Sequence, residues 1–313
     1  MTEWQQRIAR RLEAARGDRP VDLLFRGGKM VNVFTGELVS NSVAIFDGVV
    51  VGFGERQANE LVELDGEILA PGFIDGHFHL ESSLLTPAEF ARAVLPHGTT
   101  TVVADPHEIA NVAGISGVQF MLEASEDIGL EIFYMAPSCV PATHLETAGA
   151  ELSGDDIEEL ARNNRVLGLA EVMNFLGVIM GDQTILDKLE HFLDKTIDGH
   201  SPGLSGAQLD AYLCAGIGSD HECTRLEEAR EKLAKGMYIM LREGSQARDL
   251  EELAPLVTAQ TKERCMLVSD DCHPEDLLEQ GHMNRVLKRA MELSIDPITA
   301  IQLVSLNPAR YFG

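Results

Sequence analysis

The stretch PGFIDGHFHLESS at residues 71–83 marks a change in the pattern of the chain. From here almost to the C-terminus, short apolar runs alternate with amphipathic segments typical of helices. The runs are GFIDGHFHL, TTTVVADP, LEIFYMAPS, VLGLAEVM, TIDGHSP, GIGSDHE, MYIMLREGS and RCMLVSDD. Eight short strands, each followed by a helix over roughly 240 residues, match the length of a (β/α)8 barrel. We therefore predict an α/β fold, a TIM-type barrel, over residues 71–313.

An open, doubly wound sheet is the main alternative. Such a sheet usually has fewer strands and often carries a glycine-rich phosphate loop. Neither GxGxxG nor GxxxxGK followed by Ser or Thr occurs in the chain. Helix starts are indicated at Thr86 to Glu89 and at Thr224 to Glu227, each a threonine cap with a capping-box glutamate, and Gly236 suits a helix end. The barrel is favoured.

Residues 21–70 have a different texture. They contain β-branched segments broken by Gly-Gly and Asp-Gly turns: VDLLFRGGKMVNV, SVAIFDGVVVGFG and ELVELDGEILA. This pattern predicts a small β layer without helical crossovers. Residues 1–20 are polar and predict a helical extension.

Charge and hydropathy exclude several classes of function. The net charge is −25, from 50 acidic and 25 basic residues, so the chain would repel nucleic-acid backbones. No apolar stretch is long enough to cross a membrane, and the N-terminus lacks the apolar core of a secretory signal. We expect a cytoplasmic protein that binds neither nucleic acid nor membranes.

The cysteines exclude one kind of base deaminase. Their number is odd and no CxxC pair occurs, so we expect reduced structural thiols. Zinc deaminases with the H-x-E and P-C-x-x-C arrangement need that pair. The five residues are Cys139, Cys214, Cys223, Cys265 and Cys272.

Imidazoles and carboxylates recur at the predicted ends of the barrel strands. Side chains at the C-terminal ends of barrel strands point into the mouth of the active site. Four imidazoles and two carboxylates converging there form a ligand set for two adjacent divalent metal ions. The predicted ligands, from strands one, four, five, six and eight, are His77, His79, Glu171, His200, His221 and Asp270.

Two other polar motifs are weaker evidence for a metal site. His107 begins an HExxH-like string, but Asn111 occupies the position of the second histidine, and the string at His221 fails in the same way at Arg225. A zinc-protease site is therefore rejected. We expect no role in the site for Cys223, Cys272, His97, His144 and His191.

At residues 71–79 the chain resembles the first-strand motif of the amidohydrolase superfamily. Within it, the chain is similar to the adenine deaminases over about residues 20–313. The similarity rests on Glu81-Ser82-Ser83, ADPHEIANVAG at 104–114, GLAEVMNF at 168–175, DGHSPGLSG at 198–206, SDHECT at 219–224, MLREGS at 240–245 and SDDCHPEDL at 269–277.

The residue on the fourth predicted strand distinguishes adenine deaminases from many other members of the superfamily. Many binuclear members of the superfamily carry a carboxylated lysine there, whereas this chain has Glu171, as adenine deaminases do. The resemblance implies that Glu171 bridges two ions. It assigns His77, His79 and Asp270 to the buried ion and His200 and His221 to the exposed one, and it implies manganese or iron, with zinc also compatible.

The resemblance also implies a reaction, the hydrolysis of adenine to hypoxanthine and ammonia in purine salvage. The ions lower the pKa of a bridging water from about 16 toward about 7, and the hydroxide attacks C6 of adenine. Asp270 is the expected proton acceptor, with Glu81 and His107 as candidates for a second acid or base. The purine is expected near Arg242, Glu243 and Ser245, whereas Asp271 is expected to support ligands without binding metal.

In this family the chain continues past the barrel, so we expect the C-terminal part of an adenine deaminase to be lacking after Gly313. The β layer over residues 21–70 would then be an incomplete β-sandwich, whose unpaired edges favour association, and we expect a homo-oligomer. Two alternatives stay open. One is a cyclic-amide hydrolase of the same superfamily, and the other is a metal-binding chain without turnover that acts through another chain.

Overall fold

The computed structural model describes residues 1–143 and 145–313, so His144 lies outside the described residues. The chain divides into two compact units, Met1–Pro71 and Gly72–Gly313. Within the described residues, none of the helices combines the length and apolar character needed to cross a membrane.

The N-terminal unit consists of one helix and two small sheets. The strand orders are β5-β4-β1-β6 and β3-β2-β7, with antiparallel pairs except for β1 with β6 and β2 with β7. Thr2 caps the helix through a capping box with Gln5. The elements are α1 (Glu3–Arg16), β1 (Val21–Arg26), β2 (Lys29–Asn32), β3 (Glu37–Val39), β4 (Val43–Phe46), β5 (Val49–Phe53), β6 (Ala58–Glu63) and β7 (Ile68–Leu69).

An apolar hollow of about 430 Å³ lies within this unit. Phe25, Val43 and Ile45 line it, and so do Val50 and Phe53, which are exposed. The small core of the unit lies among α1, β1 and β4.

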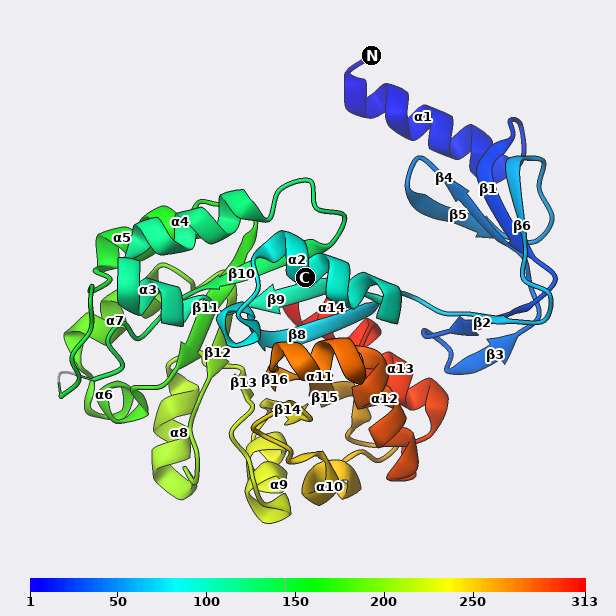
Figure 1. Cartoon of the computed structure of the whole chain (residues 1–313). Coiled ribbons are helices and arrows are strands. Elements are labelled where there is room, and N and C mark those ends of the chain that lie inside the picture. Colours follow the sequence, from blue (N-terminus) through cyan, green and yellow to red (C-terminus); the bar gives the residue numbers. More distant parts are fainter. Residues whose placement is uncertain (144) are drawn as a thin grey trace. The chain divides into compact units, whose positions relative to one another are not determined.

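The second unit alternates parallel strands with helices (Figure 1). Every one of the eight predicted runs contains a strand, so the described part of the unit has the alternating parallel arrangement of a TIM-type α/β fold, as predicted. The strands are β8 (Phe73–His79), β9 (Thr99–Ala104), β10 (Glu131–Ala136), β11 (Val166–Val172), β12 (Thr196–Gly199), β13 (Ser219–Asp220), β14 (Tyr238–Arg242), β15 (Cys265–Val268) and β16 (Asp270–Asp271).

These strands form two parallel sheets, with orders β12-β11-β10-β9-β8-β16 and β13-β14-β15. Ser269 alone separates β15 from β16, so the eighth run contributes to both sheets. The backbone N–H of Gly218 donates to the carbonyl of Ile197 at 2.9 Å, which links β12 to the segment before β13. Asp270 has a φ of 59°, in the left-handed region that aspartate tolerates better than most residues.

The helices of this unit lie around the outside of its strands (Figure 1). They are α2 (Pro87–Val94), α3 (His107–Ala113), α4 (Ile115–Ala124), α5 (Gly154–Ala161), α6 (Phe175–Met180), α7 (Gln183–Glu190), α8 (Gly206–Cys214), α9 (Leu226–Ala234), α10 (Leu250–Leu253), α11 (Pro274–Glu279), α12 (Met283–Glu292), α13 (Pro297–Leu303) and α14 (Leu306–Phe312). Short 3-10 helices span Leu80–Ser83, Leu95–His97, Ala254–Leu256 and Lys262–Arg264.

The predicted start of α2 is confirmed in position, whereas that of α9 is wrong. Thr86 is the N-cap residue of α2 and Pro87 its first residue, as expected, but the side chain of Thr86 makes no capping hydrogen bond, so the predicted capping box is not formed. Helix α9 begins after Arg225, so the predicted cap at Thr224 lies one residue too early. Gly236 does follow the end of α9, with a φ of 104° that suits glycine.

Large aromatic side chains fill the core between β8 and its covering helices. The rings of Phe78 and Phe90 stack with centroids 4.7 Å apart, and the ring of His282 meets both edge-on. Phe90 projects from α2 and is 0% exposed. This packing fixes α2 against the strand that carries His77 and His79.

We predict that Phe90→Ala lowers the free energy of unfolding by about 3–5 kcal/mol, because the substitution removes a buried ring and leaves a cavity. The matched control is Phe120→Ala on α4, where the side chain is 55% exposed and little should change. Urea unfolding followed by circular dichroism measures both variants. Equal losses would contradict the packing described here.

Candidate metal centre

Two histidines at the end of β8 begin the site. His77 and His79 are buried, and their Nε2 atoms lie 3.2 Å apart. Asp270 approaches from β16, which pairs with β8, and its Oδ1 lies 3.5 Å from Nε2 of His79. Strand alternation therefore brings both imidazoles to the same face, and the eighth run adds a carboxylate to them.

Glu171, at the end of β11, lies between two sets of imidazoles and is 3% exposed. Its Oε1 lies 3.5 Å from Nε2 of His79, whereas its Oε2 lies 3.0 Å from Nε2 of His221. Nδ1 of His200 also contacts Oε2. The two oxygens of one carboxylate thus face different groups, which is the arrangement that a bridging ligand needs.

The structure brings all six predicted ligands together. We call His77, His79, Glu171, His200, His221 and Asp270 the strand-end cluster. Their potential ligand atoms belong to several overlapping groups, in each of which the atoms lie within 4.8 Å of one another: His77–His79–Asp270, His77–Glu171–His221, His200–His221–Glu222 and His79–Asp105–His107–Glu171.

Three acidic residues near the cluster were not predicted from the sequence. Asp105 directly follows β9 and pairs with Nδ1 of His107 at 3.1 Å. Glu108 reaches Nδ1 of His79 at 3.4 Å, and Glu222 belongs to one of the four groups. Asp105 could have been found, because it occupies the same strand-end position as the predicted ligands.

The candidate acid–base residues lie at the edge of the cluster. Nδ1 of His107 is 3.4 Å from Oε1 of Glu171. Oε1 of Glu81 accepts the backbone N–H of Ile109 at 3.1 Å. Asp271 accepts a hydrogen bond from the hydroxyl of Ser82 and is absent from the potential ligand groups found among the described residues.

Arg242 lies inside the site, at the end of β14. Its Nη1 is 3.1 Å from Oδ2 of Asp270 and also contacts Glu222. Its Nη2 is 2.7 Å from Oδ2 of Asp249. With three carboxylates around it, this buried guanidinium orients the acidic side of the site.

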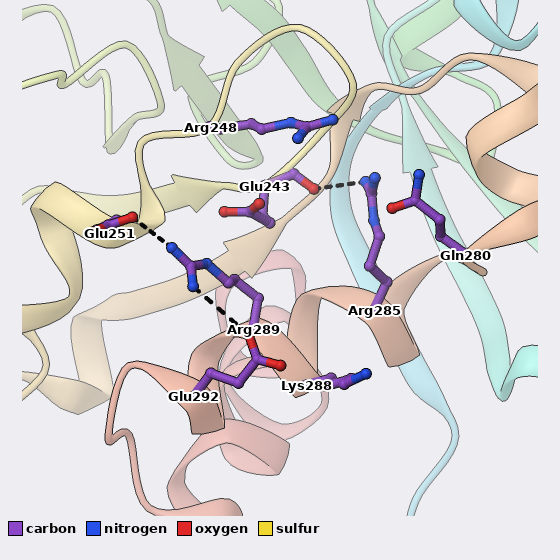
Figure 2. A pocket seen from close by; sticks show the side chains of 8 residues that line it. All are labelled: Glu243, Arg248, Glu251, Gln280, Arg285, Lys288, Arg289 and Glu292. Carbon is purple, nitrogen blue, oxygen red and sulfur yellow. Dashed lines mark hydrogen bonds and ion pairs between the residues drawn. The ribbon is translucent and has the colours of Figure 1, made fainter.

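The other two predicted substrate residues, Glu243 and Ser245, have their hydrogen-bond or pocket neighbours outside the cluster. Glu243 follows Arg242, and its side chain lines a different hollow of about 480 Å³ (Figure 2). Ser245 donates to Oδ2 of Asp276 at 2.6 Å and accepts the backbone N–H of His273. The hollow is lined by Glu243, Arg248, Glu251, Gln280, Arg285, Lys288, Arg289 and Glu292.

The carboxylates of the cluster favour positive charge on some of its imidazoles. Burial opposes protonation of His221, but Glu171, Asp270 and Glu222 together raise the pKa of His221 to about 9. Burial likewise opposes protonation of His107, and Asp105 raises its pKa to about 9. Burial alone would raise the pKa of Glu171, but the imidazoles, with His221 first, hold that pKa well below its ordinary range.

Glu81 differs from these groups. Burial, followed by repulsion from Glu108, raises the pKa of Glu81 to about 7. A carboxyl with such a pKa can both give and take a proton near neutral pH.

The residues present fit divalent metal ions. Several buried polar atoms near the cluster have no hydrogen-bond partner among the described residues: Oε2 of Glu81, Oδ1 of Asp105, Oε2 of Glu108 and Nδ1 of His221. Imidazoles mixed with carboxylates suit manganese, iron and zinc. The cysteines are all free, and burial raises the pKa of Cys272 to about 11, which disfavours a thiolate ligand.

Comparison with known proteins places this geometry in a family. The Amidohydrolase family matches residues 68–313. A curated protein named adenine deaminase from Syntrophobacter fumaroxidans is 53% identical over 306 residues, which cover 98% of this chain and 53% of that protein. One of the same name from Dehalococcoides mccartyi strain CBDB1 is 50% identical over 309 residues, covering 98% of this chain and 54% of that protein. The chain thus spans about half the length of the curated relatives it matches.

Solved structures show the same fold at low identity. A β-aspartyl dipeptidase from Fervidobacterium islandicum AW-1 superposes with a TM-score of 0.62 at 14% identity, covering 94% of this chain and 87% of that one. Molinate hydrolase superposes with a TM-score of 0.58 at 16% identity, covering 94% and 85%. Together with the family match over residues 68–313, these findings show that the chain belongs to the amidohydrolase family.

Proposed function

We propose that the chain is the catalytic part of an adenine deaminase, which hydrolyses adenine to hypoxanthine and ammonia in purine salvage. Relatives about 50% identical over nearly the whole chain bear that name. A bridging glutamate, in place of a carboxylated lysine, favours this activity over a cyclic-amide hydrolase.

One observation carries the proposal: the two oxygens of the buried Glu171 carboxylate face different imidazoles. We assign His77, His79 and Asp270 to one metal ion and His200 and His221 to the other, with Glu171 shared between them. Manganese or iron suits this ligand set, and zinc is also compatible. When bound, such ions activate water for attack at neutral pH.

In the overall reaction, a C6–O bond forms and the bond from C6 to the amino nitrogen breaks. The two protons of the water end on N1 of hypoxanthine and on ammonia. Asp270 is the proton acceptor at the attacking side, and Nη1 of Arg242, 3.1 Å from its Oδ2, holds the carboxylate in place. This contact supports the proposal that Arg242 orients Asp270.

A second group has to deliver a proton to the ring or to the leaving amine. His107 is the stronger candidate, because it lies 3.4 Å from Glu171 and Asp105 orients its Nδ1. Glu81 is the other candidate, because its Oε2 has no hydrogen-bond partner and its pKa is near neutral.

We also propose that the eight runs of the second unit form one closed (β/α)8 barrel over residues 71–313. The pairing of β16 with β8 and the bond between Gly218 and Ile197 support closure. Residues 21–70 would form part of a β-sandwich, a proposal that the apolar hollow within this unit supports, and residues 1–20 a helical extension.

Ammonia release from adenine tests the proposed activity. We expect the chain, loaded with Mn²⁺ or Fe²⁺ under reducing conditions, to release ammonia and form hypoxanthine. Glu171→Gln should abolish release of ammonia, because the neutral amide lacks the negative charge that a carboxylate shares between two cations. Ring opening of a hydantoin or dihydroorotate without ammonia release would instead support the cyclic-amide hydrolase.

Chelation tests the metal requirement. Dialysis against a chelator should remove close to two ions per chain, and readdition of Mn²⁺ should restore activity. Elemental analysis gives the count. Full activity in protein that retains less than about a tenth of an ion per chain would refute a metal-dependent reaction.

Substitution tests the second proton-transfer group. If His107 transfers a proton, His107→Asn should lower kcat by roughly 100-fold or more with the metal content unchanged. If Glu81 transfers this proton instead, Glu81→Gln should show the same loss of kcat. Glu123→Gln, an exposed glutamate on α4, is the matched control. Unchanged kcat in both test variants would exclude both residues.

A further inference from the structure

The immediate neighbours of two predicted ligands are bonded to each other. Ser201 follows His200, and Asp220 precedes His221. Ser201 donates its backbone N–H and its hydroxyl to Oδ2 of Asp220, at 2.8 and 2.6 Å. This contact ties the end of β12 to the end of β13.

A buried lysine on α9, Lys232, contacts both members of this pair. Lys232 is 0% exposed, and its Nζ lies 2.7 Å from the carbonyl oxygen of Ser201, 2.8 Å from Oε1 of Glu228 and 3.2 Å from Oδ1 of Asp220. An ammonium has three N–H donors, and here each has an acceptor. Lys232 is therefore fully committed to these partners.

The two carboxylates that accept from Lys232 also accept backbone N–H groups from the loops that follow β12 and β13. Oε1 of Glu228 also accepts the backbone N–H of Gly203 at 2.7 Å. Oδ1 of Asp220 also accepts the backbone N–H of Glu222 at 2.8 Å. The loop after His200 and the residues on either side of His221 thus depend on carboxylates that Lys232 neutralises.

Removal of the ammonium would leave two carboxylates without their cation. An unpaired buried charge is strongly unfavourable, so Asp220 would take up water or move away from Ser201. Either change loosens the loops that aim His200 and His221 at Oε2 of Glu171.

The other side of the cluster has separate support. Asp75 accepts the backbone N–H groups of His77 and Ser269 and lies 3.0 Å from Nε2 of His282. None of these contacts involves Lys232. Loss of Lys232 should therefore disturb one half of the cluster selectively.

We propose that Lys232 is a positioning residue, which holds His200 and His221 in the arrangement that forms the second metal position. This inference rests on the proposed function, in which those two histidines and Glu171 bind one of the two ions. Lys232 acts through Ser201 and Asp220 and touches no metal ligand itself.

The test is Lys232→Met in the full chain, with Mn²⁺ binding measured by equilibrium dialysis and elemental analysis. We expect one of the two Mn²⁺ ions to bind about 10–100-fold more weakly, as is typical when a partner that orients metal ligands is lost, while the other binds as in the unaltered chain. A purely structural role would instead weaken both ions together, in step with a lower Tm.

Lys262→Met is the matched control. Lys262 is half-buried and precedes β15, at the opposite end of that strand from Asp270, and its Nζ donates to Oε1 of Gln302 at 2.9 Å, so both ions should bind normally. If Lys232→Met does not fold, Asp220→Asn keeps the shape of the side chain and should weaken the same ion by a smaller factor.

Three distinguishable results would overturn the inference. If the unaltered chain binds two ions, and Lys232→Met and Asp220→Asn leave both affinities unchanged or weaken both ions together in step with a lower Tm, the positioning role is wrong and the proposed function stands. If the unaltered chain binds fewer than two ions, the two-metal proposal fails and the inference fails with it.

Discussion

The carboxylate of Glu171 is buried and has imidazoles on both of its sides, and the rest of the site follows from that constraint. A buried charge is tolerated only when it is paired and held in place. His79 lies on one side of it and His200 and His221 on the other. The main chain at this residue is also held, because the hydroxyl of Ser138 donates to the carbonyl of Glu171. A divalent ion on each side would satisfy the same negative charge more fully than protonated imidazoles can.

The proposed ligands come from the ends of five strands, yet these strand ends are not independent of one another. Buried polar contacts lie directly behind them: Asp75 behind His77, the phenol of Tyr212 behind the backbone N–H of His200, and Asp220 beside His221. Such contacts give the cluster the rigidity that catalysis requires, because a displacement of about 1 Å can cost about 100-fold in rate. Much of the stability of this unit therefore contributes to ligand geometry as well as to the fold.

The sequence carries most of the architecture because strand alternation and the position of strand ends are local properties. They sufficed to predict the eight strands and to bring His77, His79, Glu171, His200, His221 and Asp270 together. Asp105 could have been found in the same way, but Glu108 depends on tertiary structure. Glu108 lies in the first turn of α3, and its contact with Nδ1 of His79 joins segments that are far apart in the sequence. The facing of Arg242 and Glu243 was unresolved, since a strand buried on both sides gives no polar alternation to read. The capping box at Thr86 does not form and the N-cap of α9 is Arg225 instead of Thr224, because a threonine three residues before a glutamate permits a capping box without requiring one.

The most direct test of the central claim is a crystal structure of the chain loaded with Mn²⁺, with anomalous differences recorded near the manganese absorption edge. The account predicts two anomalous peaks about 3.5–4 Å apart, each next to one oxygen of Glu171. One peak should adjoin His77, His79 and Asp270, and the other His200 and His221. A single peak, or two peaks of which neither contacts Glu171, would contradict the account.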